Sequence, residues 1–169
     1  MKKIIFLALM ALPAQLLAQE PYYFHTIRTN SLTASFGRTW KAQYSYQLSR
    51  RGQLKVVGTY VSDEYDQGSN RISADVYNVN IQLQQNVFHY EEFFAHLSAG
   101  VGGYQLDAKD KIDITVRERK FSFSGGLQFE FYVMRNSIAI IGDYEILWMP
   151  FSDVYRVLHA PTIGVGFFF

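Results

Sequence analysis

One stretch decides the fold of this chain: Trp40-Lys41-Ala42-Gln43-Tyr44-Ser45-Tyr46-Gln47-Leu48-Ser49. Apolar or aromatic residues alternate with polar residues along its length, and residues 77–84 and 121–131 repeat this alternation. Successive side chains of a β-strand point to opposite faces, so each run predicts a strand with one apolar face and one polar face. A helix would scatter the same apolar residues around its axis.

The alternation continues along the chain and predicts eight strands. They cover residues 26–37, 40–49, 54–62, 72–84, 93–104, 121–133, 138–148 and 157–169. In the fourth strand the apolar residues change parity at Val76-Tyr77, which predicts a β-bulge there. The first strand fits least well, because its run Arg28-Thr29-Asn30-Ser31 is polar.

The connections between these strands alternate in length. Tight polar turns are expected at 50–53 and 134–137, an intermediate connection at 86–92, and longer polar or charged loops at 63–71, 105–120 and 149–156. Short turns on one rim and long loops on the other are typical of outer membrane barrels, whose short turns face the periplasm. The chain is therefore predicted to be all-β, an eight-stranded antiparallel up-and-down transmembrane β-barrel with both termini periplasmic.

Residues 1–18 have the features of a cleaved secretory signal peptide. Two lysines supply its positive charge, and the apolar core that follows is too short to cross a bilayer as a helix. Ala18 precedes the expected cleavage site, so Gln19 is expected to begin a single barrel domain over residues 19–169. An uncleaved N-terminal anchor is the alternative interpretation. The sequence contains no cysteine, which excludes a lipid-anchoring cysteine, a disulfide framework and a thiolate metal site.

The charge of the chain argues against direct binding to nucleic acid. The full sequence has 16 Lys and Arg against 15 Asp and Glu, and removal of Lys2 and Lys3 with the signal peptide leaves 14 against 15. The net charge thus moves from +1 to −1. Nucleic-acid binding needs a concentrated basic patch, which this composition does not offer.

The expected strand directions place aromatic residues at both ends of the apolar face, where their rings prefer the interface between lipid and water. One set lies near the outer rim and the other near the periplasmic rim: Trp40, Tyr60, Phe121 and Trp148, then Phe93, Phe131, Phe167 and Phe169. The opposite face is expected to fill the lumen, which excludes a general pore. Its polar members are Lys41, Lys55, His96, Ser98, Glu130, Asp143 and Glu145. A soluble barrel of the lipocalin type, with its apolar face turned inward around a ligand, is the alternative.

The last strand carries a pattern of its own. Thr162, Gly164, Phe167 and Phe169 resemble the assembly signal of outer membrane proteins, which is a polar residue, a glycine and two hydrophobic positions ending in an aromatic residue. The barrel-assembly machinery recognises such a strand by pairing with its edge. This machinery is therefore an expected partner during insertion, and an ordinary final strand is the alternative interpretation.

One residue pattern raises the question of catalysis. His96 and Ser98 share a face of one predicted strand, and Glu130 on the next strand is placed to orient the imidazole. The pair resembles the His-x-Ser pair of lipid A deacylases. Parity points both side chains into the lumen, away from a lipid ester, so a hydrogen-bonded lumen histidine is the favoured interpretation. No catalytic residue, cofactor, metal site or small-molecule substrate is predicted.

Several stretches resemble the TraO family of conjugative-element transfer proteins. They are Leu54–Tyr60, Phe93–Tyr104, Phe123–Glu130, Glu145–Trp148 and His159–Phe168, in this order. The resemblance implies an outer membrane component of a conjugative transfer apparatus, in contact with lipid and other transfer proteins but not directly with DNA. It carries over no catalytic residue. A generic small outer membrane barrel for adhesion or envelope stability is the main alternative, and a lipid A-modifying hydrolase is the least favoured.

Overall fold

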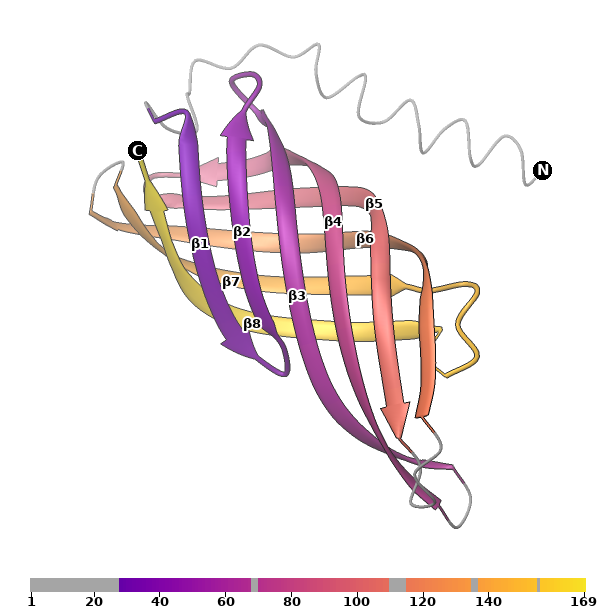
Figure 1. The fold of residues 1–169 in the computed structure, drawn as a ribbon. Coiled ribbons are helices and arrows are strands. Elements are labelled where there is room, and N and C mark those ends of the chain that lie inside the picture. The colour runs from indigo at the N-terminus through magenta and orange to yellow at the C-terminus, as the bar shows by residue number, and fades with distance from the viewer. Residues whose placement is uncertain (1–27, 68–69, 110–114, 135–136, 155) are drawn as a thin grey trace, which may run out of the picture.

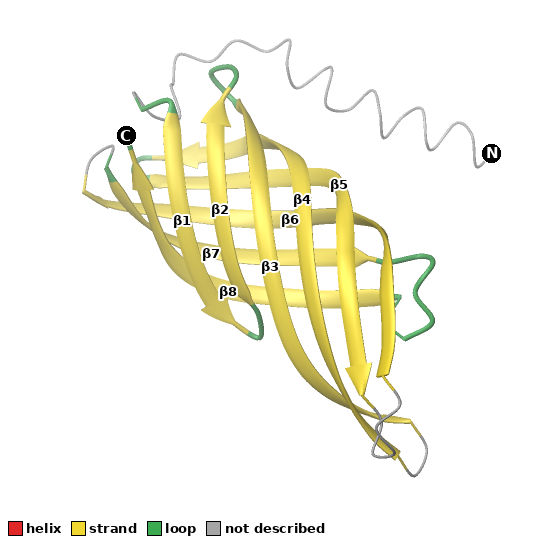
Figure 2. Ribbon diagram, in the orientation of Figure 1, coloured by secondary structure: helices red, strands yellow, loops and turns green. Residues whose placement is uncertain are grey.

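The structure is a computed structural model that describes residues 28–67, 70–109, 115–134, 137–154 and 156–169. The predicted signal peptide and the cleavage site between Ala18 and Gln19 lie outside these residues. The described chain consists of strands joined by turns and loops (Figure 2). The strands are β1 Asn30–Gly37, β2 Trp40–Gln47, β3 Gly52–Gln67, β4 Asn70–Tyr90, β5 Phe93–Lys109, β6 Thr115–Met134, β7 Ile138–Trp148 and β8 Val157–Phe168. Among the described residues, no helix is long and apolar enough to cross a membrane.

The eight strands form one closed barrel in which each strand pairs with its neighbours in the sequence (Figure 1). β8 returns to β1 in antiparallel pairing, with Ala34 opposite Val165, and so closes the ring. Gly164 permits this closure, because a β-carbon at that position would lie 2.2 Å from the carbonyl oxygen of Ala34. The predicted eight-stranded antiparallel all-β barrel is confirmed.

The barrel has two different rims. The terminal rim carries the beginning of β1, the end of β8 and short turns, and the extended rim lies at the opposite end (Figure 1). At the terminal rim the Leu48 N–H donates to the Gly52 carbonyl at 2.9 Å in the β2–β3 turn. β4 continues to Tyr90 and reverses at Glu91, whose φ is +52°, so most of the intermediate connection predicted at 86–92 is strand.

The two faces of the barrel wall differ in polarity. Exposed and buried residues alternate along the whole of β8, and the same alternation runs through β2. Outward residues are apolar, with Leu83 63% and Ile81 57% exposed, whereas inward residues such as Lys41 and Gln82 are buried. A soluble lipocalin-type barrel would have the reverse arrangement. The predicted assignment of the two faces is therefore confirmed in the wall.

Strands β3 to β6 are much longer than the others, with 16 to 21 residues against 8 to 12. Their additional residues continue past the barrel wall as a sheet, which we call the protruding sheet (Figure 1). It comprises Val61–Gln67, Asn70–Val76, Tyr104–Lys109 and Thr115–Lys120. The loops predicted at 63–71 and 105–120 are therefore wrong over most of their length, because the β3–β4 and β5–β6 hairpins keep pairing there.

The protruding sheet reverses the polarity of the wall below it. On β3, β4 and β5 its inward residues are apolar and buried, namely Val61, Ala74, Val76, Leu106 and Ala108, whereas β6 turns Glu118 inward. Its outward residues are polar and include Ser62, Ser73, Gln105, Arg117 and Arg119. Apolar side chains thus point outward in the wall and inward in the protruding sheet. This is the arrangement expected where strands pass from lipid into water.

The reversal explains the change of parity in β4. Val76 is 1% exposed and Tyr77 is 50% exposed, yet the pairing of β4 with β3 runs without a break through both residues. The β-bulge predicted at this position is therefore wrong, and what changes is the surroundings of the strand. The register shifts in the described strands lie near the terminal rim, between Asn86 and Phe88 and between Tyr132 and Met134.

Candidate functional site

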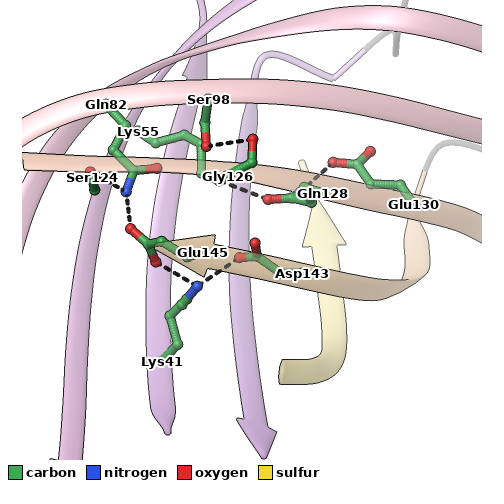
Figure 3. A network of polar contacts seen from close by, with 10 residues as sticks. All are labelled: Lys41, Lys55, Gln82, Ser98, Ser124, Gly126, Gln128, Glu130, Asp143 and Glu145. Carbon is green, nitrogen blue, oxygen red and sulfur yellow. Dashed lines mark hydrogen bonds and ion pairs between the residues drawn. The ribbon is translucent and has the colours of Figure 1, made fainter. Parts of the chain in front are cut away.

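A buried ion-pair network crosses the middle of the lumen (Figure 3). The Lys41 Nζ of β2 lies 2.8 Å from the Asp143 carboxylate and 2.6 Å from the Glu145 carboxylate, both on β7. Glu145 also accepts a hydrogen bond from the Gln82 side chain of β4. Period-2 alternation turns each of these side chains inward, and closure of the barrel brings them together from strands far apart in the sequence.

A second chain of contacts continues the network toward the terminal rim (Figure 3). The Lys55 Nζ donates to the Gln128 side-chain carbonyl at 2.7 Å, and the Gln128 amide donates to Glu130 at 2.7 Å. His96 Nε2 lies 3.5 Å from the same carboxylate, and the Tyr132 hydroxyl donates to it at 3.4 Å. Buried charges need such partners, because leaving water is costly for each ion.

Apolar clusters cover the network at both ends of the lumen. The cluster at the extended rim unites β3, β4 and β5 with the opposite wall, and contains Val61, Ala74, Val76, Tyr104, Leu106, Ala108, Leu147, Met149 and Leu158. The cluster at the terminal rim contains Phe94, Tyr132, Ala139, Ile141 and Phe168. Side chains thus fill the described lumen, as predicted for a barrel of this size.

The residues of the deacylase-like pattern do not assemble as that pattern requires. The structure places His96 beside Glu130, but the Ser98 hydroxyl donates to the Gly126 carbonyl at 3.5 Å. A serine nucleophile needs its hydroxyl bonded to the base that activates it. His96 is also buried within the lumen, away from the lipid-facing surface. The arrangement fits His96 as a buried lumen residue beside Glu130.

Metal binding finds no support in the described residues. No group of three His, Cys, Asp or Glu side chains in that part of the chain is arranged to hold a metal ion. His89 bonds the Glu91 carbonyl at 2.7 Å and His159 bonds the Tyr144 hydroxyl at 2.8 Å, at two separate places on the barrel. The fourth histidine, His25, lies outside the described residues.

Aromatic residues gather at both ends of the apolar outer face. Those at the extended rim include Trp40, Tyr60, Phe121 and Trp148, of which Phe121 is 75% exposed. The structure adds Tyr77, whose ring lies 4.9 Å from that of Tyr60, and Phe123, 5.4 Å from Trp148. Phe93, Phe131, Phe167 and Phe169 lie at the terminal rim, where Phe93 stacks on Phe129 at 5.8 Å. The added residues follow the same outward parity, so the sequence signal for them was present.

The outer face of the protruding sheet carries charges in fixed pairs. Arg117 Nε donates to the Asp107 carboxylate at 2.6 Å, and Arg119 Nε donates to the side-chain amide oxygen of Gln105 at 2.9 Å. The hydrogen bond from Gln105 and the Arg117 guanidinium lower the pKa of the Asp107 carboxyl below its usual value. This face is hydrated and polar, unlike the wall below it.

A loop between β7 and β8, residues 149–154, covers the lumen at the extended rim, and we call it the capping loop. Glu118 of β6 binds it through the Ser152 hydroxyl at 2.9 Å and the Asp153 N–H at 3.1 Å. Lys120 adds a hydrogen bond to the Phe151 carbonyl at 2.6 Å. The sequence alone predicts no role for Glu118, because its partners belong to a loop whose path depends on the fold.

The final strand places its proposed signal residues on both faces. Thr162 and Gly164 point inward, while Phe167 and Phe169 point outward at the terminal rim. Phe169 also closes the ring there, because its N–H donates to the Asn30 carbonyl at 2.9 Å and its carbonyl accepts the Asn30 N–H at 3.0 Å. Recognition of these residues by an assembly machinery stays a prediction.

Comparison with solved structures identifies the architecture. No protein-family model and no curated protein matches the chain. Neisserial surface protein A (NspA) matches with a TM-score of 0.63 at 9% identity, over 83% of this chain and 93% of that chain. The N-terminal β-barrel domain of Pseudomonas aeruginosa OprF matches with a TM-score of 0.58 at 12% identity, over 83% and 95%. The outer membrane protein Ail of Yersinia pestis, the attachment invasion locus protein, matches with a TM-score of 0.52 at 13% identity, over 83% and 93%.

The fold is that of a small outer membrane barrel. This architecture accounts for the exposed apolar wall between the two sets of aromatic residues. It also accounts for the lengths of β7 and β8, which have 11 and 12 residues, because a tilted strand needs about 9–11 residues to cross a bilayer. At these low identities the likeness concerns the fold alone.

Proposed function

We propose that this barrel is a non-enzymatic protein of the bacterial outer membrane that presents the protruding sheet to partner proteins in a conjugative DNA transfer apparatus. The observation that carries the first part is the reversal of polarity between Val76 and Tyr77. A wall with an apolar outside suits lipid, and a sheet with a polar outside suits water. The proposed orientation has both termini periplasmic and the protruding sheet outside the cell, since long connections of such barrels are extracellular.

The interior supports a role without transport or catalysis. An apolar cluster closes the extended rim over the Lys41 network, and side chains fill the described lumen. The Ser98 hydroxyl bonds the Gly126 carbonyl and His96 lies beside Glu130, so the serine is not bonded to a base that could activate it. The surface that remains for function is the protruding sheet with the capping loop, and exposed elements on a rigid scaffold are where binding residues concentrate.

The conjugative role rests on the resemblance of residues 54–168 to the TraO family. A barrel with a filled lumen fits such a role as an anchor in the membrane that contacts other transfer proteins, with no direct DNA contact. The net charge of −1 expected for residues 19–169 agrees with this. The proposed partners are outer membrane lipid, the barrel-assembly machinery during insertion and other transfer proteins.

A mating experiment tests this function. Donor cells that carry the conjugative element, with this gene deleted in frame, are expected to transfer the element much less often than wild-type donors, and a plasmid copy of the gene restores transfer. Outer membrane fractions of the complemented donors should contain the barrel in a form whose gel migration changes on heating. Normal transfer by the deletion strain would refute the conjugative role.

Adhesion or envelope stability is the second candidate, favoured by the similarity of fold to Ail, an attachment invasion locus protein. This candidate predicts that the deletion strain mates normally but attaches less to surfaces or becomes sensitive to detergent. The two functions therefore give opposite results in the same strain.

A further inference from the structure

We propose that Arg117 and Arg119, on the outer face of β6, form a binding site for a phosphate group of a lipid headgroup in the outer leaflet. Arg119 supplies the net positive charge, and Arg117 adds further N–H donors beside it. The inference rests on the proposed function only in taking the extended rim to face the outer leaflet. It adds a defined site and the chemistry that this site recognises.

The two arginines directly follow the lipid-facing wall on one face of β6. Arg117, Arg119 and Phe121 share the outward parity of this strand, and all three side chains are exposed. Phe121 is 75% exposed, the largest fraction among the described large apolar side chains. Alternate residues of a strand lie about 7 Å apart. Arg119 therefore stands one such step beyond the aromatic residue that ends the wall, and Arg117 stands two.

The neighbouring strands place Arg119 at the level of the membrane interface. It pairs in register with Gln105 of β5, which in turn pairs with Tyr77 of β4. Tyr77 pairs with Tyr60 of β3, and both belong to the aromatic residues of the extended rim. Such rings prefer the boundary between lipid and water, which is where the headgroups of the lipids lie. Arg119 is thus at the level of the headgroup phosphates.

A chain of hydrogen bonds fixes both guanidinium groups on the sheet. Arg119 Nε donates to the side-chain oxygen of Gln105 at 2.9 Å, and the Gln105 amide nitrogen donates to the Asp107 carboxylate at 2.9 Å. Asp107 also accepts from Arg117 Nε at 2.6 Å. Within the described residues, nothing accepts a hydrogen bond from the Nη groups of either arginine. These Nη donors form the planar fork that matches the oxygens of a phosphate.

The charges of this network leave one positive charge in excess. Asp107 balances Arg117, with which it forms an ion pair. Arg119 instead bonds a neutral amide, and in the part of the chain that the structure describes no carboxylate forms an ion pair with it. Gln105 therefore orients Arg119 without cancelling its charge. An anion at this face meets a guanidinium that is already held in place, so little conformational entropy is lost on binding.

Two other cations near the extended rim are engaged within the protein. Lys120 Nζ donates to the Phe151 carbonyl at 2.6 Å and lies 3.4 Å from the Asp153 carboxylate. Arg38 of the β1–β2 turn pairs with Asp63. Arg119 differs from both because its charge is unbalanced and its position is next to the lipid-facing wall.

Lipid binding by the full barrel tests the proposal. The purified barrel in a non-ionic detergent is mixed with fluorescent lipid A that carries two phosphates, or with dephosphorylated lipid A that has the same acyl chains. We expect the phosphorylated lipid to bind at least about tenfold more tightly, and this advantage to shrink as the salt concentration rises. Equal binding of the two lipids would overturn the proposal.

Variants locate the site on the sheet. Arg119→Gln removes the charge and should lower the affinity for phosphorylated lipid A at least about tenfold, while binding of the dephosphorylated lipid stays the same. Gln105→Glu places a carboxylate against Arg119 and should weaken binding in the same way. Unchanged binding by Arg119→Gln would refute the site. Heat-dependent gel migration shows that each variant is folded.

Lys109→Gln is the matched control for these variants. It removes the same charge from the outer face of the same sheet, about 14 Å beyond Gln105 along β5. Binding of phosphorylated lipid A should therefore change little. An equal loss in Lys109→Gln and Arg119→Gln would show a general attraction between charges and would overturn a defined site.

Two competitors identify the source of the phosphate. Inorganic phosphate at the concentration of the lipid should not displace it, because the acyl chains of the lipid add apolar contact with the wall beside Phe121. A peptide that alternates glutamate and serine, at the same concentration, should not displace it either. Displacement by the first would assign the site to soluble phosphate and displacement by the second to an acidic protein segment, and each result would overturn the lipid assignment.

The mating assay distinguishes this inference from the proposed function. Normal transfer by the deletion strain refutes the conjugative role, whatever the lipid experiment gives. If the deletion strain is defective and Arg119→Gln binds phosphorylated lipid A like wild type, only the lipid site is refuted. A selective loss of phosphorylated lipid binding in Arg119→Gln supports the site with either mating result.

Discussion

The ammonium of Lys41 lies 2.6 Å from the carboxylate of Glu145, across the lumen from β2 to β7. Asp143 holds the same ammonium at 2.8 Å, so one buried cation is shared by two buried carboxylates. Removing Lys41 would leave two buried carboxylates without this cation. The stability of the barrel should therefore fall more than it would on loss of a surface charge.

Lys41→Met is therefore expected to destabilise the barrel by about 3–5 kcal/mol, the usual cost of leaving buried charges without their partner. The measurement is denaturant unfolding in detergent, together with the temperature at which gel migration changes. Adding Asp143→Asn and Glu145→Gln to the same chain should recover most of the loss, because it removes the unpaired charges. Arg117→Met on the outer face of the protruding sheet is the control and should have little effect. An unchanged Lys41→Met barrel would show that the network contributes nothing to stability.

Accessibility along one face of β4 should change where the polarity reverses. The chain has no cysteine, so Ser73→Cys and Ile81→Cys each introduce a single thiol on the outward face of the same strand. A water-soluble maleimide should label position 73 in folded barrels and leave position 81 unlabelled until the protein is denatured. Labelling of position 73 in intact cells would place the protruding sheet outside. Labelling of both positions in folded barrels would contradict a lipid-covered wall.

The role of the terminal aromatic residue can be separated from the role of its backbone. Deleting Phe169 removes both a side chain and two hydrogen bonds to Asn30, whereas Phe169→Ala removes the side chain alone. If the assembly machinery recognises the ring, Phe169→Ala should lower the amount of barrel in the membrane while folding in detergent stays normal. Quantitative blotting of outer membrane fractions measures this. Loss of barrel on deletion but not on substitution would assign the effect to closure of the ring.

The outer face of the protruding sheet should respond to acid only at low pH. Its Asp107 has a lowered pKa because Gln105 donates a hydrogen bond to it and Arg117 is paired with it. A carboxyl whose pKa is lower in the folded state stabilises that state above its ordinary pKa of 3.8, and this contribution is lost as the pH falls through the lowered value. NMR titration of the Asp107 carboxyl should thus give a midpoint below 3.8, and Arg117→Gln should raise it. A midpoint at or above the ordinary value would contradict the pairing.

The wall of the barrel was predictable because its alternation is long and regular, and because Trp40, Phe121 and Trp148 mark its rim. The protruding sheet was not, since polar residues such as Ser73 and Asp107 look the same in a solvated loop and on the wet face of a strand. The evidence lay in the apolar positions, where Ala74 and Val76 have the opposite parity to Tyr77 and Val79. A bulge and a change of medium produce the same pattern in a sequence, and only the continuous register distinguishes them.

The interior of the barrel was likewise predictable in part. Parity correctly placed Lys41, Lys55, His96, Glu130, Asp143 and Glu145 in the lumen. Parity does not say which of them meet, because contacts across a barrel depend on strand tilt and stagger. Pairing of Lys41 with Glu145 required the closed structure, whereas Glu130 beside His96 was predicted because the two residues lie on neighbouring strands.

The unbroken pairing of β3 to β6 from wall to protruding sheet has a mechanical consequence. No hinge separates the part suited to lipid from the part suited to water, because the register shifts of the described strands lie toward the terminal rim. A load applied to the sheet would pull on continuous ladders of hydrogen bonds along the strands and not on a flexible tether. The barrel would then act as a rigid anchor in the bilayer that transmits tension from a bound partner to the cell envelope.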